Sequence, residues 1–325
     1  MRVVTAADID RVLTYPALVE ALREAFRGDI IVPVRHHHTI PQAGSDATLL
    51  LMPAWNAEGE RFLGCKIVTV FPDNAKAEKP SVYANYILLS GETGEPLAML
   101  EGRTLTAWRT AAASALAASY LARQDAAHLV MIGAGALSPH LIRAHSAVRP
   151  ITRVTLWNRT RRRAMALAFD LARAGIAIEI ADDLEEAVRK ADIVSCATLS
   201  AAPLVRGAWL RKGAHVDLVG GYTPKMREAD DDAVKRAKVY VDTRDGALKE
   251  AGDVVVPVKK GILKRDDLGG DLFDLCRGAA KGRRLKTEIT LFKSVGSAIE
   301  DLAAAMLVWR SLNAEPEQDK AAAAM

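Results

Sequence analysis

The chain of 325 residues is longer than the roughly 100 to 200 residues of one typical domain, which predicts two domains. Half of the residues are apolar and 26% are charged, which excludes a wholly disordered or fibrous chain. The 44 basic and 40 acidic side chains give a formal net charge of +4, without a dense basic tract carrying interleaved aromatic residues. A nucleic acid partner is therefore not expected.

The distribution of charged residues predicts a cytoplasmic protein without a membrane segment. Charges interrupt positions 1–12, where a signal peptide would need a continuous apolar run. Arg109 likewise interrupts the alanine-rich stretch 105–122, which is unsuited to face lipid. The 3 cysteines, which are widely spaced, are expected to be reduced packing residues: Cys65, Cys196 and Cys276.

The first 120 residues combine one helix with several short strands. Residues 17–27 have the spacing of an amphipathic helix. Apolar runs at 48–52, 62–71 and 81–89 are separated by turn-rich segments such as GETGEP. This order predicts an α+β unit with a largely antiparallel sheet.

Beyond Arg123, short apolar runs alternate with amphipathic helical stretches. This alternation requires a doubly wound parallel sheet, so we expect an α/β unit of the Rossmann type. A last apolar run at 289–292 leads into a helix that ends near Trp309, followed by a frayed tail, AEPEQDKAAAAM. The expected strands are 128–132, 153–157, 193–197, 215–219 and 239–241.

We expect the last helix to return to the first domain. The substrate-binding and dimerisation domain would then comprise residues 1–120 with 293–325, and residues 121–292 would form the Rossmann dinucleotide-binding domain. The fold class is therefore α/β, with a doubly wound parallel sheet beside an α+β domain.

The segment HLVMIGAGALSPHLIRAH joins an apolar strand to an amphipathic helix through a glycine-rich turn. Gly133, Gly135 and Ser138 stand in the G-x-G-x-x-(small) frame of dinucleotide-binding sites. Gly133 permits the tight turn, Gly135 lets a pyrophosphate approach the main chain, and a small residue at Ser138 keeps the helix close to the strand. Because a βαβ pattern follows, the turn indicates dinucleotide binding.

The next strand ends in Asn158, Arg159 and Thr160, where an NAD-binding site usually supplies an acidic residue for the ribose. Arg159 could instead pair with the 2′-phosphate of NADPH through charge-assisted hydrogen bonds. We therefore favour NADPH. NADH remains an alternative, because a solvated arginine face would have a similar sequence.

Residues at the carboxyl ends of later strands complete the expected cofactor site, because ligands bind there in open α/β sheets. Thr198 follows one strand, and Val219 and Gly220 follow the next. Ser294 and Gly296 stand at a strand-to-helix junction and are expected to approach the cofactor through main-chain amides.

Three cations of the first domain stand among apolar or small residues. They are Arg35 in VPVRHHH, Lys66 in FLGCKIVTVFPDN and Arg109 in LTAWRTAAASALA. Burying a guanidinium such as that of Arg109 is unfavourable unless a carboxylate pairs with it, and a substrate could supply that carboxylate. Internal salt bridges, or side chains that extend to solvent, are the alternative.

Seven segments together form a specific pattern: VPVR, LLMP, GCKIVTVFPDN, LTAWRTAAASALAASYLA, GAGA, PLVRGAWLRKGAHVDLVGG and EITLFKSVGSAIEDLA. With this pattern the chain resembles the ornithine cyclodeaminase and mu-crystallin family over nearly its whole length. The resemblance implies a homodimer in which the first domain, with the last helix, binds substrate and forms the dimer contact. It also implies that Arg35, Lys66 and Arg109 hold the substrate carboxylate. The NRT at 158–160 is similar to that of NADPH-binding, mu-crystallin-like members.

Two positions depart from the pattern of true cyclodeaminases. Those enzymes have a catalytic Asp after the two glycines of the strand end, whereas this chain has Tyr222. The acidic residue that precedes LMP is replaced by Leu50. Ornithine deamination needs a base and an anchor for two amino groups, while reducing a preformed C=N bond needs hydride, a carboxylate clamp and one proton. The sequence therefore favours the reduction.

We predict a cyclic ketimine reductase that uses NADPH to convert Δ1-pyrroline-2-carboxylate or Δ1-piperideine-2-carboxylate into L-proline or L-pipecolate. Lys66 is the candidate proton donor, although water could serve equally, and Tyr222 would shape the pocket or assist through its hydroxyl. Glu300 and Asp301 form either an exposed acidic pair on a helix or a group near the nicotinamide.

Three other functions remain as alternatives to the ketimine reductase. They are an ornithine cyclodeaminase, an amino-acid oxidoreductase of the alanine dehydrogenase or iminosuccinate reductase kind, and a mu-crystallin-like protein that binds NADPH or a small ligand.

A histidine run raises the question of a metal. His36, His37 and His38 lie on an extended segment, where adjacent side chains alternate faces, and no other spacing in the sequence completes a set of ligands. We therefore expect no metal. His36 or His37 could instead line the substrate pocket beside Arg35.

Overall fold

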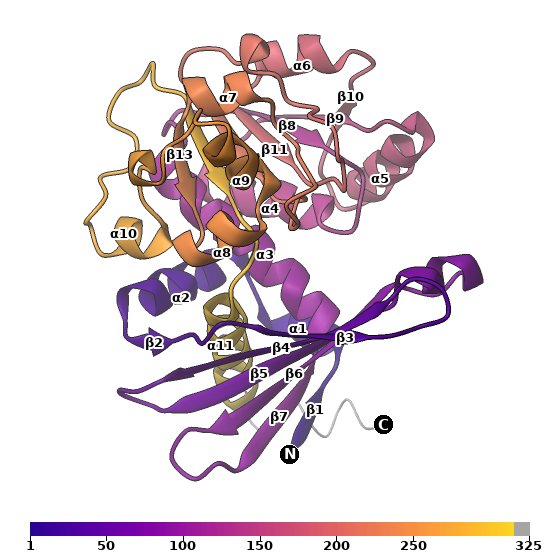
Figure 1. Cartoon of the computed structure of the whole chain (residues 1–325), viewed down its shortest axis with the longest axis vertical. Coiled ribbons are helices and arrows are strands. Elements are labelled where there is room, and N and C mark those ends of the chain that lie inside the picture. Colours follow the sequence, from indigo (N-terminus) through magenta and orange to yellow (C-terminus); the bar gives the residue numbers. More distant parts are fainter. Residues whose placement is uncertain (315–325) are drawn as a thin grey trace. The chain divides into compact units, whose positions relative to one another are not determined.

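The computed structural model describes residues 1–314, so all but the first residue of the tail AEPEQDKAAAAM lies outside the described residues. The chain divides into two compact units: Met1–Arg109 with the segment that starts at Ser297, and Thr110–Gly296 (Figure 1). The predicted division is also discontinuous, but its first boundary stood after residue 120. In the structure this boundary falls inside helix α3 (Gly102–Leu121), because residues from Thr110 onward make their contacts within the second unit.

The first unit is built on a 7-stranded sheet. Its strands are β1 (Arg2–Val4), β2 (Ile30–Ile31), β3 (His36–Ile40), β4 (Ala47–Asn56), β5 (Phe62–Val70), β6 (Val82–Ser90) and β7 (Pro96–Glu101). The strand order is β1-β7-β6-β5-β4-β2, with β3 also paired to β4; β1 and β7 run parallel and the other pairs are antiparallel. The predicted α+β unit with a largely antiparallel sheet is confirmed.

Helices cover one face of this sheet. Helix α11 (Ala298–Ala314) packs on β4, β5 and β6 and on α2 (Tyr15–Arg27), while α1 (Ala6–Val12) also contacts α11 (Figure 1). Thr14 caps the start of α2, because its hydroxyl accepts a hydrogen bond from the Ala17 amide. The apolar residues of α2 recur at helical spacing and are buried: Leu18, Leu22 and Phe26.

A row of directly paired residues crosses the sheet of the first unit. Val4, Leu100, Tyr86, Lys66 and Met52 are successive partners on β1, β7, β6, β5 and β4. Paired residues of neighbouring strands point to the same face, and all five side chains are buried. The strand register therefore places the Lys66 ammonium among apolar and aromatic neighbours, on the face of the sheet that the helices cover.

The second unit is a doubly wound parallel sheet, as predicted. Its strands are β8 (His128–Ile132), β9 (Arg153–Trp157), β10 (Glu179–Ile180), β11 (Ile193–Cys196), β12 (His215–Leu218), β13 (Lys238–Val241) and β14 (Thr290–Lys293). Its helices are α4 (Ser138–Val148), α5 (Arg161–Arg173), α6 (Leu184–Lys190), α7 (Asp231–Arg236), α8 (Arg244–Glu250), α9 (Gly252–Lys259) and α10 (Leu272–Cys276).

The strand order of the second unit is β10-β9-β8-β11-β12-β14-β13, with all pairs parallel. The chain order therefore reverses between β8 and β11, which is the kind of switch point where ligands bind in open α/β sheets. β8, β11 and β12 are buried throughout, as expected for central strands with helices on both faces.

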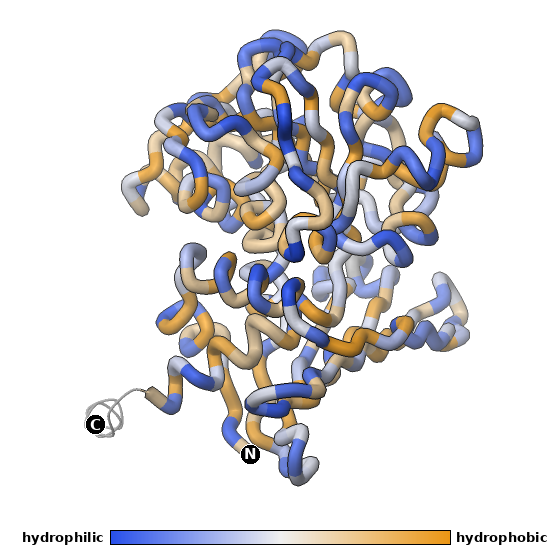
Figure 2. Tube along the Cα trace, turned by 90° about the vertical axis from the view of Figure 1, so that its left-hand side faces the viewer, coloured by the Kyte–Doolittle hydropathy of each residue, from blue (hydrophilic) through white to orange (hydrophobic). Residues whose placement is uncertain are grey.

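Among the described residues, no helix combines the length and the apolar character needed to span a bilayer. Hydrophilic residues recur along the coloured part of the trace (Figure 2).

Candidate functional site

The glycine turn follows β8 and leads directly into α4. Gly133 has a φ of 107°, and a Cβ there would lie 2.7 Å from the Ala197 carbonyl oxygen, so only glycine fits. A Cβ at Gly135 would meet nothing within 4 Å, which leaves open space over this part of the turn. The buried Ser138 hydroxyl donates to the Gly133 carbonyl at 2.7 Å, which fastens the start of α4 to the end of β8.

The end of β9 supports the same turn. The Asn158 side chain accepts a hydrogen bond from the Ala134 amide at 3.1 Å and donates to the Thr160 carbonyl at 2.9 Å. Arg159 and Thr160 are exposed where β9 ends, while Arg161 pairs with Asp182. Of the predicted cofactor residues here, Asn158 therefore organises the loop and Arg159 stands at the surface.

Glu228 ties together the loops after β11 and β12 and was missed in the sequence. It is fully buried, and its Oε1 accepts from the Thr198 amide at 2.6 Å and from the Thr198 hydroxyl at 2.9 Å. Its Oε2 accepts from the Gly220 amide at 2.8 Å. Burial raises the pKa of this carboxyl, against the influence of Lys293. No sequence signal identified Glu228, because an acidic residue among charged neighbours is typical of the protein surface.

The junction between β14 and α11 is held by a second buried carboxylate. The Val295 and Gly296 amides both donate to Asp242 Oδ2 at 2.7 Å, and the Ser294 hydroxyl lies 3.2 Å from the same oxygen. The Ser294 amide donates to the Leu218 carbonyl. The amides that were expected to approach the cofactor are therefore used within the protein, so a cofactor contact by Ser294 would have to involve other atoms.

Tyr222, the predicted pocket residue of the second unit, lies in the loop after β12. Its side chain is 48% exposed, in contrast to Val219, which is buried at the end of the same strand. Exposure leaves the hydroxyl accessible to a ligand.

Lys66 and Arg109 come together in the first unit around two acidic residues of α11. The Lys66 Nζ lies 2.9 Å from Oδ1 and 2.7 Å from Oδ2 of Asp301. The Arg109 Nε lies 3.0 Å from Asp301 Oδ1, and its Nη1 donates to Glu300 at 2.5 Å. Lys66 and Arg109 are 3% and 6% exposed, and both acidic residues are fully buried. These four residues form the buried charge cluster of the first unit.

The buried charge cluster shifts the protonation of its members. Burial lowers the pKa of Lys66 to about 8, with a further lowering by Arg109, while Asp301 and Glu300 act in the opposite direction. Burial also raises the pKa of the Tyr86 hydroxyl, with Asp301 adding to the effect. Lys66 can therefore lose its proton at a pH at which an ordinary lysine keeps it.

The structure excludes one alternative and confirms another that the sequence left open for these charges. Glu300 and Asp301 are not an exposed acidic pair, because α11 turns both side chains into the interior of the first unit. The carboxylates that compensate Arg109 and Lys66 are also supplied by the protein itself, so the internal salt bridges considered as an alternative do occur. Burial of these cations therefore does not by itself require a substrate carboxylate.

Arg35 lies just before β3 and is half-buried. His36 of β3 pairs with Leu51 of β4, so one more step of this register would place Arg35 opposite Met52, the neighbour of Lys66 in the buried row. The His36, His37 and His38 side chains are exposed. Within residues 1–314, no group of three or more His, Cys, Asp or Glu side chains has the arrangement needed to hold a metal ion.

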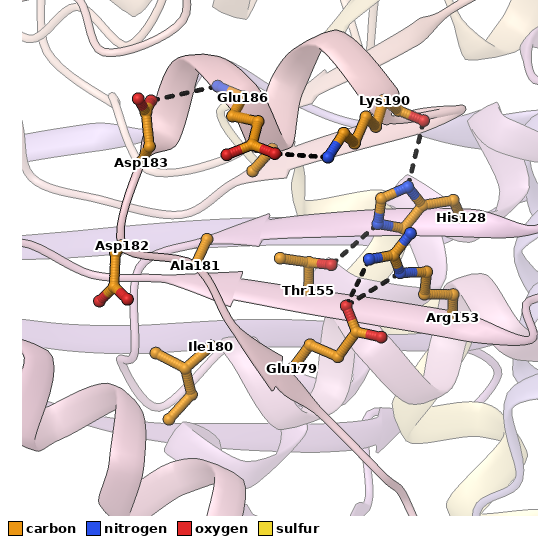
Figure 3. A pocket seen from close by; sticks show the side chains of 11 residues that line it. His128, Arg153, Thr155, Glu179, Ile180, Ala181, Asp182, Asp183, Glu186 and Lys190 are labelled. Atoms are coloured by element: carbon orange, nitrogen blue, oxygen red, sulfur yellow. Dashed lines mark hydrogen bonds and ion pairs between the residues drawn. The ribbon is translucent and has the colours of Figure 1, made fainter.

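A pocket of about 260 Å³ lies beside the edge strand β10 of the second unit (Figure 3). Its charged side chains pair with one another: Arg153 contacts Glu179 at 2.6 Å, and Lys190 contacts Glu186 at 2.5 Å. None of the predicted site residues lines this pocket. The candidate functional residues therefore lie elsewhere, at the strand ends of the second unit and in the buried charge cluster.

A family model described as ornithine cyclodeaminase/mu-crystallin family matches residues 2–315. The chain belongs to this family. The resemblance seen in the sequence is thereby confirmed. One curated relative, the Δ1-pyrroline-2-carboxylate reductase of Colwellia psychrerythraea, is 36% identical, and the match covers 96% of this chain and 99% of the relative.

Solved structures of family members share the fold. The Δ1-pyrroline-2-carboxylate reductase of Thermococcus litoralis, in complex with NADH and L-proline, is 34% identical and has a TM-score of 0.89, covering 96% of this chain and 98% of that protein. An archaeal alanine dehydrogenase dimer with bound NAD is 29% identical, with a TM-score of 0.87 and 96% of each chain covered. The predicted fold class is confirmed by these matches.

Proposed function

We propose that the chain is an NADPH-dependent ketimine reductase acting on the CH–NH group, and that it converts Δ1-pyrroline-2-carboxylate or Δ1-piperideine-2-carboxylate into L-proline or L-pipecolate. The observation that carries the proposal is the buried Lys66 ammonium, whose pKa is lowered to about 8 beside the buried Arg109 guanidinium. The relatives named Δ1-pyrroline-2-carboxylate reductase support this substrate class.

The buried charge cluster suits a reaction that needs a carboxylate clamp and one proton. Arg109 is assigned to the substrate carboxylate together with Arg35, since a guanidinium has five N–H donors and can serve a third carboxylate besides two protein ones. An imine accepts hydride more readily when its nitrogen is protonated. Lys66 is assigned to give that proton, because its pKa lies close to the working pH of a general acid. Tyr222 is assigned to shape the pocket or donate through its exposed hydroxyl.

The nicotinamide cofactor, which supplies the hydride, is assigned to the second unit. Gly133, Gly135 and Ser138 form the turn that would face the pyrophosphate, with Asn158 and Thr160 behind it and Thr198, Val219, Gly220 and Ser294 at the neighbouring strand ends. Arg159 supports NADPH, because it is exposed at the end of β9, where an acidic residue would repel a 2′-phosphate. The similar structures hold NADH or NAD, so the preference needs a direct comparison of the dissociation constants of NADPH and NADH.

Steady-state oxidation of NADPH tests the proposal. Turnover with Δ1-pyrroline-2-carboxylate or its six-membered homologue is expected, and its absence would refute the reductase. Turnover with pyruvate and ammonia would instead favour an amino-acid dehydrogenase, the alternative supported by the similarity to the archaeal alanine dehydrogenase. Ammonia release from ornithine would indicate a cyclodeaminase. Tight NADPH binding without any turnover would indicate a mu-crystallin-like binding protein.

We also propose that the chain forms a homodimer through the sheet of the first unit. The face opposite the buried row carries the paired apolar residues Val3, Met99, Ile87, Cys65 and Pro53, and the Val3 side chain is 61% exposed. The other four are partly exposed, and a partly exposed apolar sheet face of this kind is typical of subunit interfaces. Light scattering should give twice the chain mass, and Ile87→Lys should shift the mass to that of a monomer. A wild-type protein that stays monomeric at micromolar concentration contradicts this proposal.

A further inference from the structure

We propose that Asp301 is a positioning residue, whose carboxylate holds the Lys66 ammonium and the Arg109 guanidinium in one arrangement and keeps a cationic partner when Lys66 releases its proton. This inference rests on the proposed ketimine reduction and names the group that prepares the proton donor.

The geometry shows one carboxylate shared by two cations. Both oxygens of Asp301 lie within 2.9 Å of the Lys66 Nζ, and Oδ1 is also 3.0 Å from the Arg109 Nε. Lys66 comes from β5, Arg109 from α3 and Asp301 from the first turn of α11. The carboxylate therefore fixes the separation of two groups that no single element could place.

Burial explains why a second cation matters. Asp301 is fully buried, and a buried carboxylate without a counter-ion is strongly disfavoured. If Lys66 were its only partner, proton release by Lys66 would leave the negative charge uncompensated. The contact with the Arg109 Nε reduces this cost, because an arginine stays protonated throughout, although the same guanidinium also compensates Glu300.

The remaining groups around Lys66 fit this role. Glu300 of α11 accepts a hydrogen bond from the Arg109 Nη1 atom, so Arg109 has two carboxylate partners, Glu300 and Asp301. Tyr86, the direct partner of Lys66 on β6, places a buried hydroxyl in the same region, and Met52 on β4 is apolar. Lys66 therefore lies near one guanidinium, two carboxylates and one phenol. Of these groups, the Asp301 carboxylate contacts the Lys66 ammonium directly.

These groups complete the proton balance of the proposed reaction, and the hydride would come from the nicotinamide cofactor assigned to the second unit. The imine nitrogen first forms its N–H bond with a proton from the Lys66 Nζ. Hydride from the nicotinamide would then add to the iminium carbon, and the electron pair of the C=N π bond would move to nitrogen, so that the imine is reduced and the cofactor oxidised. Neutral Lys66 then takes a proton from water, while Asp301 stays ionised beside Arg109.

Asp301→Asn in the full chain tests the inference. Removing the negative charge should lower the pKa of Lys66, so the fall of kcat at alkaline pH should move by about one to three pH units to lower pH. Asp301→Glu should restore the position of this fall in part. The control Glu60→Gln removes a carboxylate that pairs with Arg310 of α11 at the protein surface, and it should leave the profile unchanged. An unchanged profile in folded Asp301→Asn protein would overturn the inference.

A second measurement separates this inference from the proposed reaction. The 13Cε resonance of Lys66, assigned by its loss in Lys66→Arg, can be titrated without substrate. A titration midpoint lowered by Asp301→Asn and restored by Asp301→Glu supports the role of Asp301 even if no ketimine is reduced. A midpoint that does not move refutes it even if the reductase activity is established. Should Asp301→Asn not fold, Asp301→Ser takes its place in both measurements, and a midpoint and profile identical to those of the wild type would count against the inference.

Discussion

Arg109 donates to Glu300 across 2.5 Å, although the two residues stand 191 positions apart in the chain. The contact joins the middle of α3 to the start of α11 inside the first unit, and neither side chain reaches solvent to an appreciable extent. A guanidinium held in this way is pre-oriented, so it loses little conformational freedom when it binds a further carboxylate.

Arg109→Met should therefore weaken substrate binding strongly. Loss of charge-assisted hydrogen bonds of about 1.5–3 kcal/mol corresponds to a rise of roughly 10- to 150-fold in KM for the imino acid. The same change leaves Glu300 with a lost partner and should lower the free energy of unfolding by about 3–5 kcal/mol. Steady-state kinetics and urea unfolding check both values. Arg103→Met, an exposed position on the same helix, is the control, and an unchanged KM in Arg109→Met would remove Arg109 from the clamp.

The activity of the wild-type protein should fall as the pH rises through about 8. The pKa of Lys66 is lowered to about 8, so the ammonium is present below this pH and is lost above it, and imine reduction needs the protonated form. A pH series of kcat/KM measures the fall. Lys66→Arg keeps its charge at high pH, so any activity that it retains should not fall in this range. A wild-type profile that stays flat to pH 10 would exclude Lys66 as the proton donor.

Arg159→Ala should weaken the binding of NADPH by about 10- to 100-fold, which is the loss expected for charge-assisted contacts to a 2′-phosphate. The dissociation constant of NADH should stay the same, because NADH lacks this phosphate. Fluorescence titration measures both constants. Arg162→Ala, also exposed and on α5, is the matched control. Equal losses of affinity for NADPH and NADH would show that Arg159 does not contact the 2′-phosphate.

The two glycines of the turn should respond differently to alanine. Gly133→Ala puts a Cβ at a φ of 107° and 2.7 Å from a carbonyl oxygen, so it should lower the free energy of unfolding by at least about 1–3 kcal/mol. Gly135→Ala meets no protein atom within 4 Å, so stability should change little while cofactor affinity falls. Thermal unfolding and cofactor titration distinguish the two effects. Normal cofactor binding by Gly135→Ala would place the pyrophosphate elsewhere.

The sequence predicted the strands of the second unit well, because central parallel strands are continuous apolar runs. The predicted ranges 128–132 and 153–157 coincide with β8 and β9, and the last run is displaced by a single residue, from 289–292 to Thr290–Lys293. The glycine turn follows β8 as expected. These features depend on neighbouring residues, so a local pattern contains the information.

The sequence could not show which charges are buried together. Glu300 and Asp301 stand side by side, a pattern that is typical of a helix surface, and their partners lie 191 and 235 positions away. Glu228 similarly serves Thr198 and Gly220, which lie on different loops. Only the packing of α11 and of the loop after β12 decides that these carboxylates face inward, and periodicity carries no information about such contacts.

The pairing of β5 with β6 decides whether the Lys66 ammonium lies on the buried face of the sheet. A slip of a single residue would put Cys65 or Ile67 where Lys66 stands, because neighbouring side chains of a strand point in opposite directions. Gly64 opposes such a slip, since any Cβ at this position would lie 2.0 Å from the Tyr86 hydroxyl. Misalignment of β5 against β6 by one residue would therefore turn the Lys66 ammonium away from Arg109 and Asp301 in a single step.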